Sequence, residues 1–453
     1  MSTDVKRRLV VLGAGESGTG AAILAKDKGF DVFLSDSGTI APKYLEVLER
    51  EGIAHEQGGH TPDKVLSADE IVKSPGIPLD APVILAARAK NIPVISEIEF
   101  AGRYTDSKMV CITGSNGKTT TTLLIHHILT EAGLDAGLAG NVGNSLAYQV
   151  AREPHAVYVV ELSSFQLDNM YDFKANIAVI LNITPDHLDR YDHVMQNYVN
   201  AKFRILQNMT PSDCFIFWQD DPIITEQLRH ITTEARLLPF AEHREEGTAA
   251  YIDAENNLIF NTPGTSMSMP RADLALSGLH NVFDSMAAGL SACLFELRKD
   301  EVRRGLSDFS AVEHRLEPVA TIDGVRWIND SKATNVNSCY YALEAMTTPT
   351  VLILGGKDKG NDYSEILPLV KEKVKAIVAM GLHNEKIMDY FKGHVPELVS
   401  TDNLADAVAE CRRLAAAGDT VLLSPCCASF DLFKSYEDRG RRFKAAVHAL
   451  ETE

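Results

Sequence analysis

Val110-Cys-Ile-Thr-Gly-Ser-Asn-Gly-Lys-Thr-Thr120 is the stretch that decides how the middle of this chain folds. The apolar residues 109–112 predict a buried strand, residues 113–119 a tight loop, and residues 120–129 a helix. A glycine loop between a strand and a helix N-terminus can hold phosphate, because backbone N–H groups and the helix dipole face the anion. Lys118 adds a positive charge, and the Thr119 hydroxyl is suited to Mg²⁺.

The loop is shorter than the usual phosphate loop. In the pattern G-x-x-x-x-G-K-[ST] the first glycine would fall at Ile112, whereas here the loop begins at Gly114. A chance glycine turn between a strand and a helix is the alternative interpretation.

Length, composition and charge restrict the class of protein. The chain has 453 residues, 45% of them hydrophobic, and a net charge of −18. This length predicts two or three domains of an ordinary soluble protein. The negative charge argues against nucleic acid or an anionic membrane as a partner. No apolar run reaches the roughly 18 residues needed to cross a membrane.

The cysteines give no sign of a disulfide framework. There are seven of them, an odd number, and none forms a C-x-x-C pair. Cys426 and Cys427 are adjacent, which is poor geometry for an ordinary disulfide. Reduced thiols in a cytoplasmic protein are the simplest interpretation.

The first part of the chain contains a second glycine loop. Gly13-x-Gly15-x-x-Gly18, with Asp36 about 20 residues further on, matches the dinucleotide fingerprint. Taken alone, this motif favours NAD or FAD. Its physical content is only that a pyrophosphate can lie on the helix N-terminus, and a UDP-sugar also carries a pyrophosphate.

Short apolar strands alternate with helical stretches along the whole chain, which predicts a parallel α/β fold. We expect three domains, at residues 1–96, 97–310 and 311–453, and no internal repeats. The expected strands are 9–12, 31–34, 70–73, 93–95, 109–112, 156–160, 177–181, 351–354, 376–378 and 420–423.

Polar residues follow two strands of the central segment. Glu161 ends one strand, where its carboxylate would face the ligand crevice of an α/β protein, and a helix cap is the alternative. Asp186, His187 and Asp189 follow the next strand, and the acidic neighbours could fix the histidine tautomer. Lys202 lies on a predicted helix and by pattern alone is an ordinary surface lysine.

More polar stretches follow in the last third of the chain. His280 and Asn281 begin a predicted helix that could donate to an adenine, with a plain asparagine cap as the alternative. Residues 330–334 combine acidic, basic and hydroxyl groups, which favours phosphate and ribose contacts over a solvated loop. A glycine turn at 355–360 carries two lysines, and Ser429 precedes a helix that could hold a carboxylate.

These blocks, in this order, resemble the motifs of the Mur ligases over nearly the whole chain. ELSSFQL and SPCCASFD favour the branch of that family that adds D-glutamate, and the D-N-P-R signature of the branch that adds a diamino acid is absent. The blocks are GSNGKTT (114–120), ELSSFQL (161–167), NITPDHLDRY (182–191), GLHN (278–281), EHRLE (313–317), WINDSKATN (327–335) and SPCCASFDLFKSYEDRG (424–440).

The resemblance implies a fold and an activity. The fold would be a Rossmann-like N-terminal domain for a UDP-sugar, a central P-loop-type ATPase domain, and a Rossmann-like C-terminal domain that binds the amino acid and closes the site. The activity would be that of a cytoplasmic, monomeric ligase that depends on ATP and Mg²⁺. It would join D-glutamate to UDP-N-acetylmuramoyl-L-alanine through an acyl phosphate, in peptidoglycan precursor synthesis. Two Mg²⁺ sites and a carbamylated Lys202 are implied as well.

The resemblance also implies roles for single residues. The catalytic residues would be Lys118, Glu161, His187 and Lys202, and the metal ligands Thr119, Glu161, His187 and Lys202. ATP contacts would come from Gly114, Ser115, Asn116, Gly117, Lys118, Thr119, Thr120, Asn281, Arg315 and Asp330. The UDP-sugar would contact Ser17, Asp36, Ser37, Ser74 and Asn141, and D-glutamate would contact Lys332, Thr334, Lys359, Ser429 and Tyr436.

Some positions depart from the family pattern, and three rival functions stay open. Glu16, Ser17, Asp284, Lys357 and Tyr436 replace the residue types common in relatives, and none of them belongs to the ATP or metal core. A nicotinamide dehydrogenase would leave the central glycine loop unexplained. Another Mur or folylpolyglutamate-type ligase would differ in its amino acid. A non-enzymatic nucleotide-binding module would leave unexplained the candidate catalytic groups in all three segments.

Overall fold

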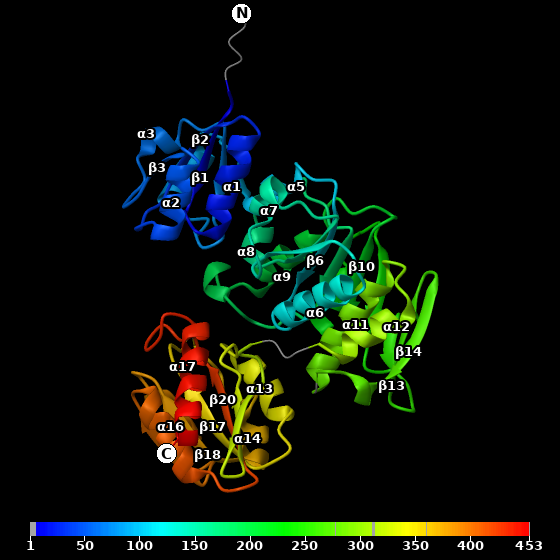
Figure 1. The fold of residues 1–453 in the computed structure, drawn as a ribbon, viewed down its shortest axis with the longest axis vertical. Coiled ribbons are helices and arrows are strands. Elements are labelled where there is room, and N and C mark those ends of the chain that lie inside the picture. Colours follow the sequence, from blue (N-terminus) through cyan, green and yellow to red (C-terminus); the bar gives the residue numbers. More distant parts are fainter. Residues whose placement is uncertain (1–5, 277, 310–312, 359, 453) are drawn as a thin grey trace, which may run out of the picture. The chain divides into compact units, whose positions relative to one another are not determined.

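A computed structural model describes residues 6–276, 278–309, 313–358 and 360–452. Three sheets, each formed by a separate stretch of chain, confirm the predicted three-domain α/β fold (Figure 1). The contacts divide the molecule into two compact units. The first comprises residues up to Leu274 and Phe283–Asp308, and the second comprises Ala275–Val282 and residues from Phe309 on. The domain boundaries at 96 and 310 stay predictions.

The first sheet lies in the N-terminal domain. Its elements are β1 Arg8–Leu12, α1 Glu16–Asp27, β2 Asp31–Ser35, α2 Pro42–Arg50, β3 Ala54–Glu56, α3 Pro62–Val65, β4 Glu70–Lys73, α4 Pro82–Ala89 and β5 Val94–Ser96. The strand order is β3-β2-β1-β4-β5, and all strands are parallel. Leu9 and Val11 pack toward α1, and Val10 and Leu12 pack toward α3 and α4. Helices on both faces explain why the strands are apolar on both sides.

The second sheet lies in the central domain. Its helices and strands up to β10 are α5 Glu97–Gly102, β6 Lys108–Thr113, α6 Lys118–Glu131, β7 Ala136–Gly140, α7 Leu146–Arg152, β8 Val157–Glu161, α8 Ser164–Leu167, β9 Ile177–Ile180, α9 Met195–Phe203 and β10 Cys214–Trp218, with short 3₁₀ helices η1 Leu188–Arg190 and η2 Arg204–Leu206. They are followed by α10 Pro222–Leu228, β11 Arg236–Phe240, β12 Ala250–Ile252, β13 Asn257–Thr262, β14 Thr265–Pro270, η3 Arg271–Asp273, α11 Leu279–Cys293 and α12 Lys299–Ser307.

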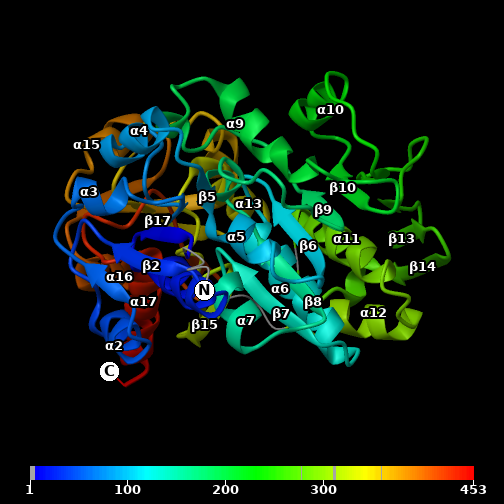
Figure 2. The same ribbon diagram turned by 90° about the horizontal axis from the view of Figure 1, so that it is seen from above.

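The strand order of the second sheet is β14-β13-β12-β11-β10-β9-β6-β8-β7. Strands β6 to β12 pair in parallel, and β12, β13 and β14 form an antiparallel extension that the apolar pattern did not predict. Helix α6 packs against β7, β8 and α12 (Figure 2). Helix α1 packs against α5 and α7, and one hydrophobic core runs from the first sheet into the second. The N-terminal and central domains therefore share a core within the first unit.

The third sheet lies in the C-terminal domain. Its elements are β15 Glu317–Ile322, β16 Val325–Asn329, α13 Val336–Glu344, β17 Thr350–Gly355, α14 Leu367–Lys373, β18 Val374–Met380, α15 Glu385–Phe391, β19 Glu397–Thr401, α16 Leu404–Leu414, β20 Thr420–Cys426, α17 Tyr436–Ala449 and η4 Leu450–Thr452. The order is β15-β16-β20-β17-β18-β19. Leu352 and Leu354 pack on α13, α14 and α15, and Val351 and Ile353 pack on α16 and α17. The sheet is therefore the middle of three layers.

All ten expected strands are present. Their bounds differ from the expected ones by at most three residues, at the end of β20. The expected helix at 120–129 is α6, which begins at Lys118 and ends at Glu131. All seven cysteines are buried, and none of them forms a disulfide. Among the described residues, no helix is both long and apolar enough to cross a membrane.

Candidate active site

The glycine loop of the central domain leads directly into α6. Gly117 is the N-cap and has a φ of 81°, in the left-handed region that favours glycine. The Lys118 Nζ turns back and donates to the carbonyl oxygens of Gly114 (2.9 Å) and Ser115 (2.8 Å). The loop therefore binds the Lys118 ammonium at the expected phosphate site. The oxygens of a bound phosphate would compete with these two carbonyl oxygens for that ammonium.

The register of the second sheet brings three loops to one edge. Ile112 pairs with Glu161 across β6 and β8, and Thr113 pairs with Ile180 across β6 and β9. Because the carboxyl ends of parallel strands share one edge, Glu161, the glycine loop and the loop after β9 lie together. A cavity of about 280 Å³ lies there, and it is lined by Pro75, Gly76, Lys118, Asn141, Ser163, Ser164, Phe165, Asp186, His187, Tyr198 and Lys202.

Glu161 has the environment of a cation ligand. Its side chain is buried, and Oε1 accepts a hydrogen bond from the Asn141 Nδ2 (2.8 Å). Oε2 is also buried and has no hydrogen-bond partner. A buried carboxylate oxygen without a donor is costly unless a cation or another donor completes it. The potential metal ligands at this edge of the sheet therefore fit Mg²⁺.

Lys202 is not the surface lysine that its sequence pattern suggested. It is only 2% exposed, because α9 packs on α8 and places the side chain under the glycine loop. Its Nζ donates to the Gly114 carbonyl (2.7 Å) and lies 4.5 Å from the centre of the Tyr198 ring. Burial, and next the charge of Lys118, hold the pKa of Lys202 well below its usual value. The structure therefore favours a neutral amine beside the phosphate loop.

His187 follows the turn after β9 in a left-handed conformation with a φ of 52°. Its Nε2 lies 3.6 Å from the Asp186 carboxylate, and its ring meets the Phe165 ring edge-on. A non-glycine residue in this conformation costs about 1–3 kcal/mol, a strain that clusters at functional sites. Asp189, which was grouped with these residues, is exposed and does not line the cavity.

The residues predicted to hold the UDP-sugar surround the first glycine loop. The Asp36 carboxylate accepts hydrogen bonds from the backbone N–H groups of Ala14 (2.6 Å) and Gly38 (2.7 Å). Ser17 lies in the first turn of α1, and Ser74 lies so close to Gly13 that an added Cβ would clash with it. Ser37 lines a second cavity, of about 620 Å³. The structure places these residues in one region, and their substrate roles stay predictions.

Asp330 marks the predicted nucleotide region of the C-terminal unit, at the carboxyl end of β16. Its Oδ2 accepts a hydrogen bond from the Ser424 hydroxyl (2.8 Å), and Oδ1 accepts from the Leu316 N–H (3.2 Å). Burial raises the pKa of Asp330 to about 7, against the opposing effects of Ser424 and the Arg315 charge. In the same unit, burial and the Arg315 charge lower the pKa of His280, beside the buried Asn281, to about 3.

The predicted amino-acid contacts of the C-terminal unit lie near the start of α17. Lys332 Nζ is 5.6 Å from the centre of the Tyr436 ring, and Ser429 is buried. Thr334 is half-buried in the loop between Lys332 and α13. Lys359 lies outside the described residues, so its predicted contact with D-glutamate has no structural counterpart here.

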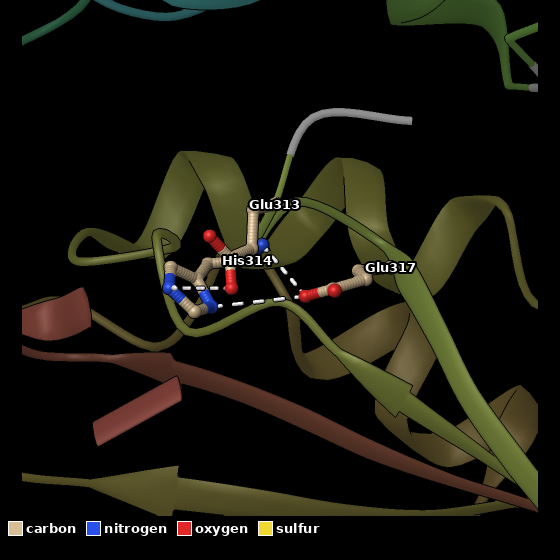
Figure 3. Close-up of side chains that lie close together, drawn as sticks. All are labelled: Glu313, His314 and Glu317. Atoms are coloured by element: carbon tan, nitrogen blue, oxygen red, sulfur yellow. Dashed lines mark hydrogen bonds and ion pairs between the residues drawn. The ribbon is translucent and has the colours of Figure 1, made fainter. Parts of the chain in front are cut away.

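One cluster resembles a metal site, but its two carboxylates already share a lysine. Among the described residues, only Glu313, His314 and Glu317 form a group of three or more acidic, histidine or cysteine side chains close enough to share an ion (Figure 3). Lys444 Nζ, however, lies 2.6 Å from Glu313 Oε1 and 2.8 Å from Glu317 Oε1. Asn329 Nδ2 lies 2.9 Å from His314 Nδ1 and donates to it, which uses that lone pair. The cluster is therefore a brace between β15, β16 and α17.

Three buried polar residues were missed from sequence. Lys73 ends β4 and donates to the carbonyl oxygens of the loop that follows, Tyr198 lines the cavity, and Arg439 donates to the carbonyl oxygens of Ser331 and Cys427. Lys73 had a signal, because a lysine directly after apolar strand residues is unusual. Tyr198 had one too, since it precedes Lys202 by four residues and so shares its helix face. Arg439 had none apart from its motif.

Protein-family models match all three parts of the chain. Residues 7–96 match the Mur ligase MurD-like N-terminal domain, residues 112–292 the Mur ligase middle domain, and residues 314–427 the glutamate ligase domain of Mur ligases. Together the matched ranges contain the two glycine loops and nearly all the described site residues.

Two curated relatives are similar over almost their full length. The UDP-N-acetylmuramoylalanine–D-glutamate ligase of Bacteroides fragilis is 61% identical over 445 residues, which is 98% of this chain and 100% of the relative. The enzyme of the same name from Porphyromonas gingivalis is 56% identical over 444 residues, covering 98% of this chain and 99% of the relative.

Solved structures with low sequence identity share the fold. MurF from Acinetobacter baumannii superimposes with a TM-score of 0.63 at 18% identity, over 98% of this chain and 93% of that one. UDP-N-acetylmuramate–alanine ligase MurC from Thermotoga maritima gives a TM-score of 0.62 at 18% identity, over 98% and 99% of the two chains. At this identity the likeness concerns the fold alone.

Proposed function

The chain belongs to the Mur ligase family, and from this membership we propose that it joins D-glutamate to UDP-N-acetylmuramoyl-L-alanine with hydrolysis of ATP to ADP. The observation that carries the proposal is the 61% identity, over 98% of the chain, to an enzyme of that name. The cavity that combines Lys118, His187 and Lys202 beside the buried Glu161 supports it.

The reaction proceeds in two steps. The carboxylate of UDP-N-acetylmuramoyl-L-alanine attacks the γ-phosphate of ATP, so that an acyl phosphate forms and ADP leaves. The amine of D-glutamate then attacks the acyl carbon and expels phosphate. Two anions must approach each other in the first step, and the Lys118 ammonium offsets their repulsion.

The metal site is proposed from the donors at the edge of the second sheet. Thr119, Glu161 and His187 would hold Mg²⁺, which supplies charge neutralisation at the phosphates. Glu161 contributes the buried oxygen that lacks a donor, and His187 is preset by its strained backbone. A second Mg²⁺ site, completed by a modified Lys202, is part of the proposal.

Lys202 is proposed to carry a carbamate. A cation beside Mg²⁺ would be repelled, whereas a carbamate formed with CO₂ is anionic and can bind metal. Only the neutral amine attacks CO₂, and the lowered pKa of Lys202, caused by burial and Lys118, supplies that form. In the present structure the amine hydrogen-bonds the Gly114 carbonyl, so modification would exchange this contact for metal and phosphate contacts.

Three further features belong to the proposal. The UDP-sugar binds the N-terminal domain (1–96), ATP the central domain (97–310) and D-glutamate the C-terminal domain (311–453). The protein acts in the cytoplasm, where its nucleotide substrates and its reduced cysteines are found. It acts as a monomer.

The decisive experiment measures ADP release with ATP, Mg²⁺, UDP-N-acetylmuramoyl-L-alanine and a panel of amino acids. We expect release with D-glutamate and not with L-glutamate, L-alanine, L-lysine or diaminopimelate. Release with a different amino acid would show another ligase of the family. Calorimetric titration with NAD and NADP provides the control for a dehydrogenase, and tight binding of either without binding of the uridine nucleotide would contradict the proposal.

A further inference from the structure

The cavity of about 620 Å³ in the N-terminal domain is nearly apolar. It lies beyond the carboxyl ends of β2 and β4, on either side of β1, where the strand order reverses. Ligands of open α/β sheets bind at such a crevice. Of the residues that line it, proline, leucine, isoleucine, valine, alanine and glycine make up all but Ser37 and His60. A largely apolar cavity with two polar side chains suits a nucleobase.

His60 is held in place by a chain of hydrogen bonds. Its Nδ1 lies 2.7 Å from the Ser35 Oγ, and the same Oγ donates to the Glu56 Oε1 at 2.8 Å. Partial burial opposes ionisation of Glu56, but hydrogen bonds from Thr61, Ser35 and Lys64 lower the pKa of Glu56 to about 2. Glu56 is therefore a carboxylate near neutral pH and can only accept.

The position of one proton follows from this chain. The Ser35 hydroxyl has a single hydrogen, and a carboxylate at 2.8 Å requires it. The Ser35 Oγ must then accept from His60, so Nδ1 carries a proton, and in the neutral form of the imidazole it is the only ring nitrogen that does. The His60 Nε2 is consequently an acceptor.

We propose that His60 is a specificity-determining residue whose Nε2 accepts a hydrogen bond from the N3–H of uracil in this cavity. The inference rests on the proposed function, which supplies the uridine nucleotide. Uracil presents a donor at N3, whereas cytosine presents an acceptor there. A fixed acceptor in the cavity therefore favours uridine over cytidine nucleotides. Ser35 and Glu56 act as positioning residues, because they set the tautomer without reaching the base.

The first test needs no ligand. A long-range ¹H–¹⁵N correlation spectrum of the full chain, assigned with His60→Phe, reports which ring nitrogen carries the proton. We expect Nδ1–H in the wild type and a mixture of tautomers in Ser35→Ala. A wild-type spectrum with Nε2–H overturns the inference, whatever the enzyme's substrate is.

The second test compares the affinities for UDP and CDP by calorimetry. The wild type should prefer UDP, and His60→Phe should lose about tenfold in affinity for UDP with little change for CDP, since one buried hydrogen bond is removed. Ser35→Ala should reduce the preference by a smaller factor. His55→Phe is the matched control, because His55 lies on β3 and does not line the cavity.

The outcomes separate the inference from the proposed function. If His60→Phe lowered the affinities for UDP and CDP equally, the His60 ring would only pack against the base. The inference would then fail, while the uridine site would stand. Absence of UDP binding in the wild type, with the Nδ1–H tautomer observed, would remove the uridine site itself. In that case the proposed function and the inference fail together.

Discussion

Two loops of this chain share one design and differ in chemistry. The Gly13–Gly18 loop follows β1 and begins α1, and the Gly114–Gly117 loop follows β6 and begins α6. Each presents backbone N–H groups at a helix N-terminus, where an anion is stabilised. The backbone design therefore gives both loops the same basic capacity for phosphate.

The difference lies in the side chains that the fold brings to each loop. The first loop is closed by a carboxylate, because Asp36 accepts from the Ala14 and Gly38 N–H groups. The second loop is closed by two lysines, which both donate to the Gly114 carbonyl. An acid at the first loop suits the binding of a nucleotide that is not cleaved there, and the Lys118 cation at the second suits phosphoryl transfer. A glycine motif alone thus does not distinguish binding from catalysis.

The largest effect is expected where the second loop loses its cation. Lys118→Ala should lower ligase turnover by roughly 100-fold or more, since one preorganised charge stabiliser contributes about 3–4 kcal/mol. Steady-state ADP release measures it. Lys108→Ala is the control, because Lys108 lies at the opposite end of β6 with its Nζ over the Phe295 ring (4.2 Å). Near-normal turnover in Lys118→Ala would remove the distinction between the two loops.

Substitutions of Lys202, the second lysine at the Gly114–Gly117 loop, test the same comparison between the two loops. Lys202→Ala should fold and bind ATP but lose on the order of 100-fold in turnover, because the proposed carbamate is gone. Short carboxylic acids should restore part of the rate by filling the vacated position. Lys202→Arg should not respond, since its guanidinium keeps the site occupied and positive. Equal responses of the two variants to acetate would contradict the carbamate.

Glycine substitutions compare the two positions within the first loop. A Cβ at Gly18 would clash with the backbone carbonyl of Gly13, whereas a Cβ at Gly15 has no atom within 4 Å. Gly18→Ala should therefore lower the free energy of unfolding by about 1–3 kcal/mol, and Gly15→Ala should leave it nearly unchanged. Urea denaturation followed by circular dichroism measures both. Similar stabilities of the two variants would show that the N-terminus of α1 shifts to accommodate the added methyl group at little cost.

The smallest effect concerns the buried cation of the N-terminal domain. Burial, and next the Arg190 charge, lower the pKa of Lys73 to about 8, against the favourable charge of Asp168. The native protein then releases this proton at lower pH than the unfolded chain does. The free energy of unfolding should therefore rise with pH, by about 1 kcal/mol between about pH 7.5 and about pH 9, relative to Lys73→Met. Parallel pH profiles of the two proteins would contradict the shifted pKa.

The sequence predicted elements well where the pattern is local. Apolar runs located ten strands, and the glycine loop located the start of α6 within two residues. Ten of the twenty strands in the described part of the chain were not predicted. Strands β3 and β12 are short, and β13 and β14 alternate buried and exposed residues. Strand β10 was missed although it is a continuous apolar run, CFIFW.

For the site, the sequence predicted that the glycine loop with Lys118 follows one strand and that Glu161 ends another, but it did not show that the two lie at the same edge of the sheet. Their proximity depends on β8 lying next to β6, although β7 comes between them in the chain. Lys202 shows the limit most clearly, because no local pattern distinguishes it from an exposed lysine. The hydrogen-bond chain from Glu56 through Ser35 to His60 joins residues from β2, β3 and the loop after β3, and no spacing rule connects them.

By itself, the sequence determined the fold class, the two anion-binding helix starts and, through its motifs, the family. These depend on residues that are neighbours in the chain, so backbone geometry and side-chain periodicity reveal them. Tertiary structure alone decided that Lys202 is buried against Gly114, that Asp36 accepts from the first loop, and that Lys444 pairs with both Glu313 and Glu317. Charge and protonation depend on desolvation and on partners far away in sequence, and both arise only when the sheets and helices have packed.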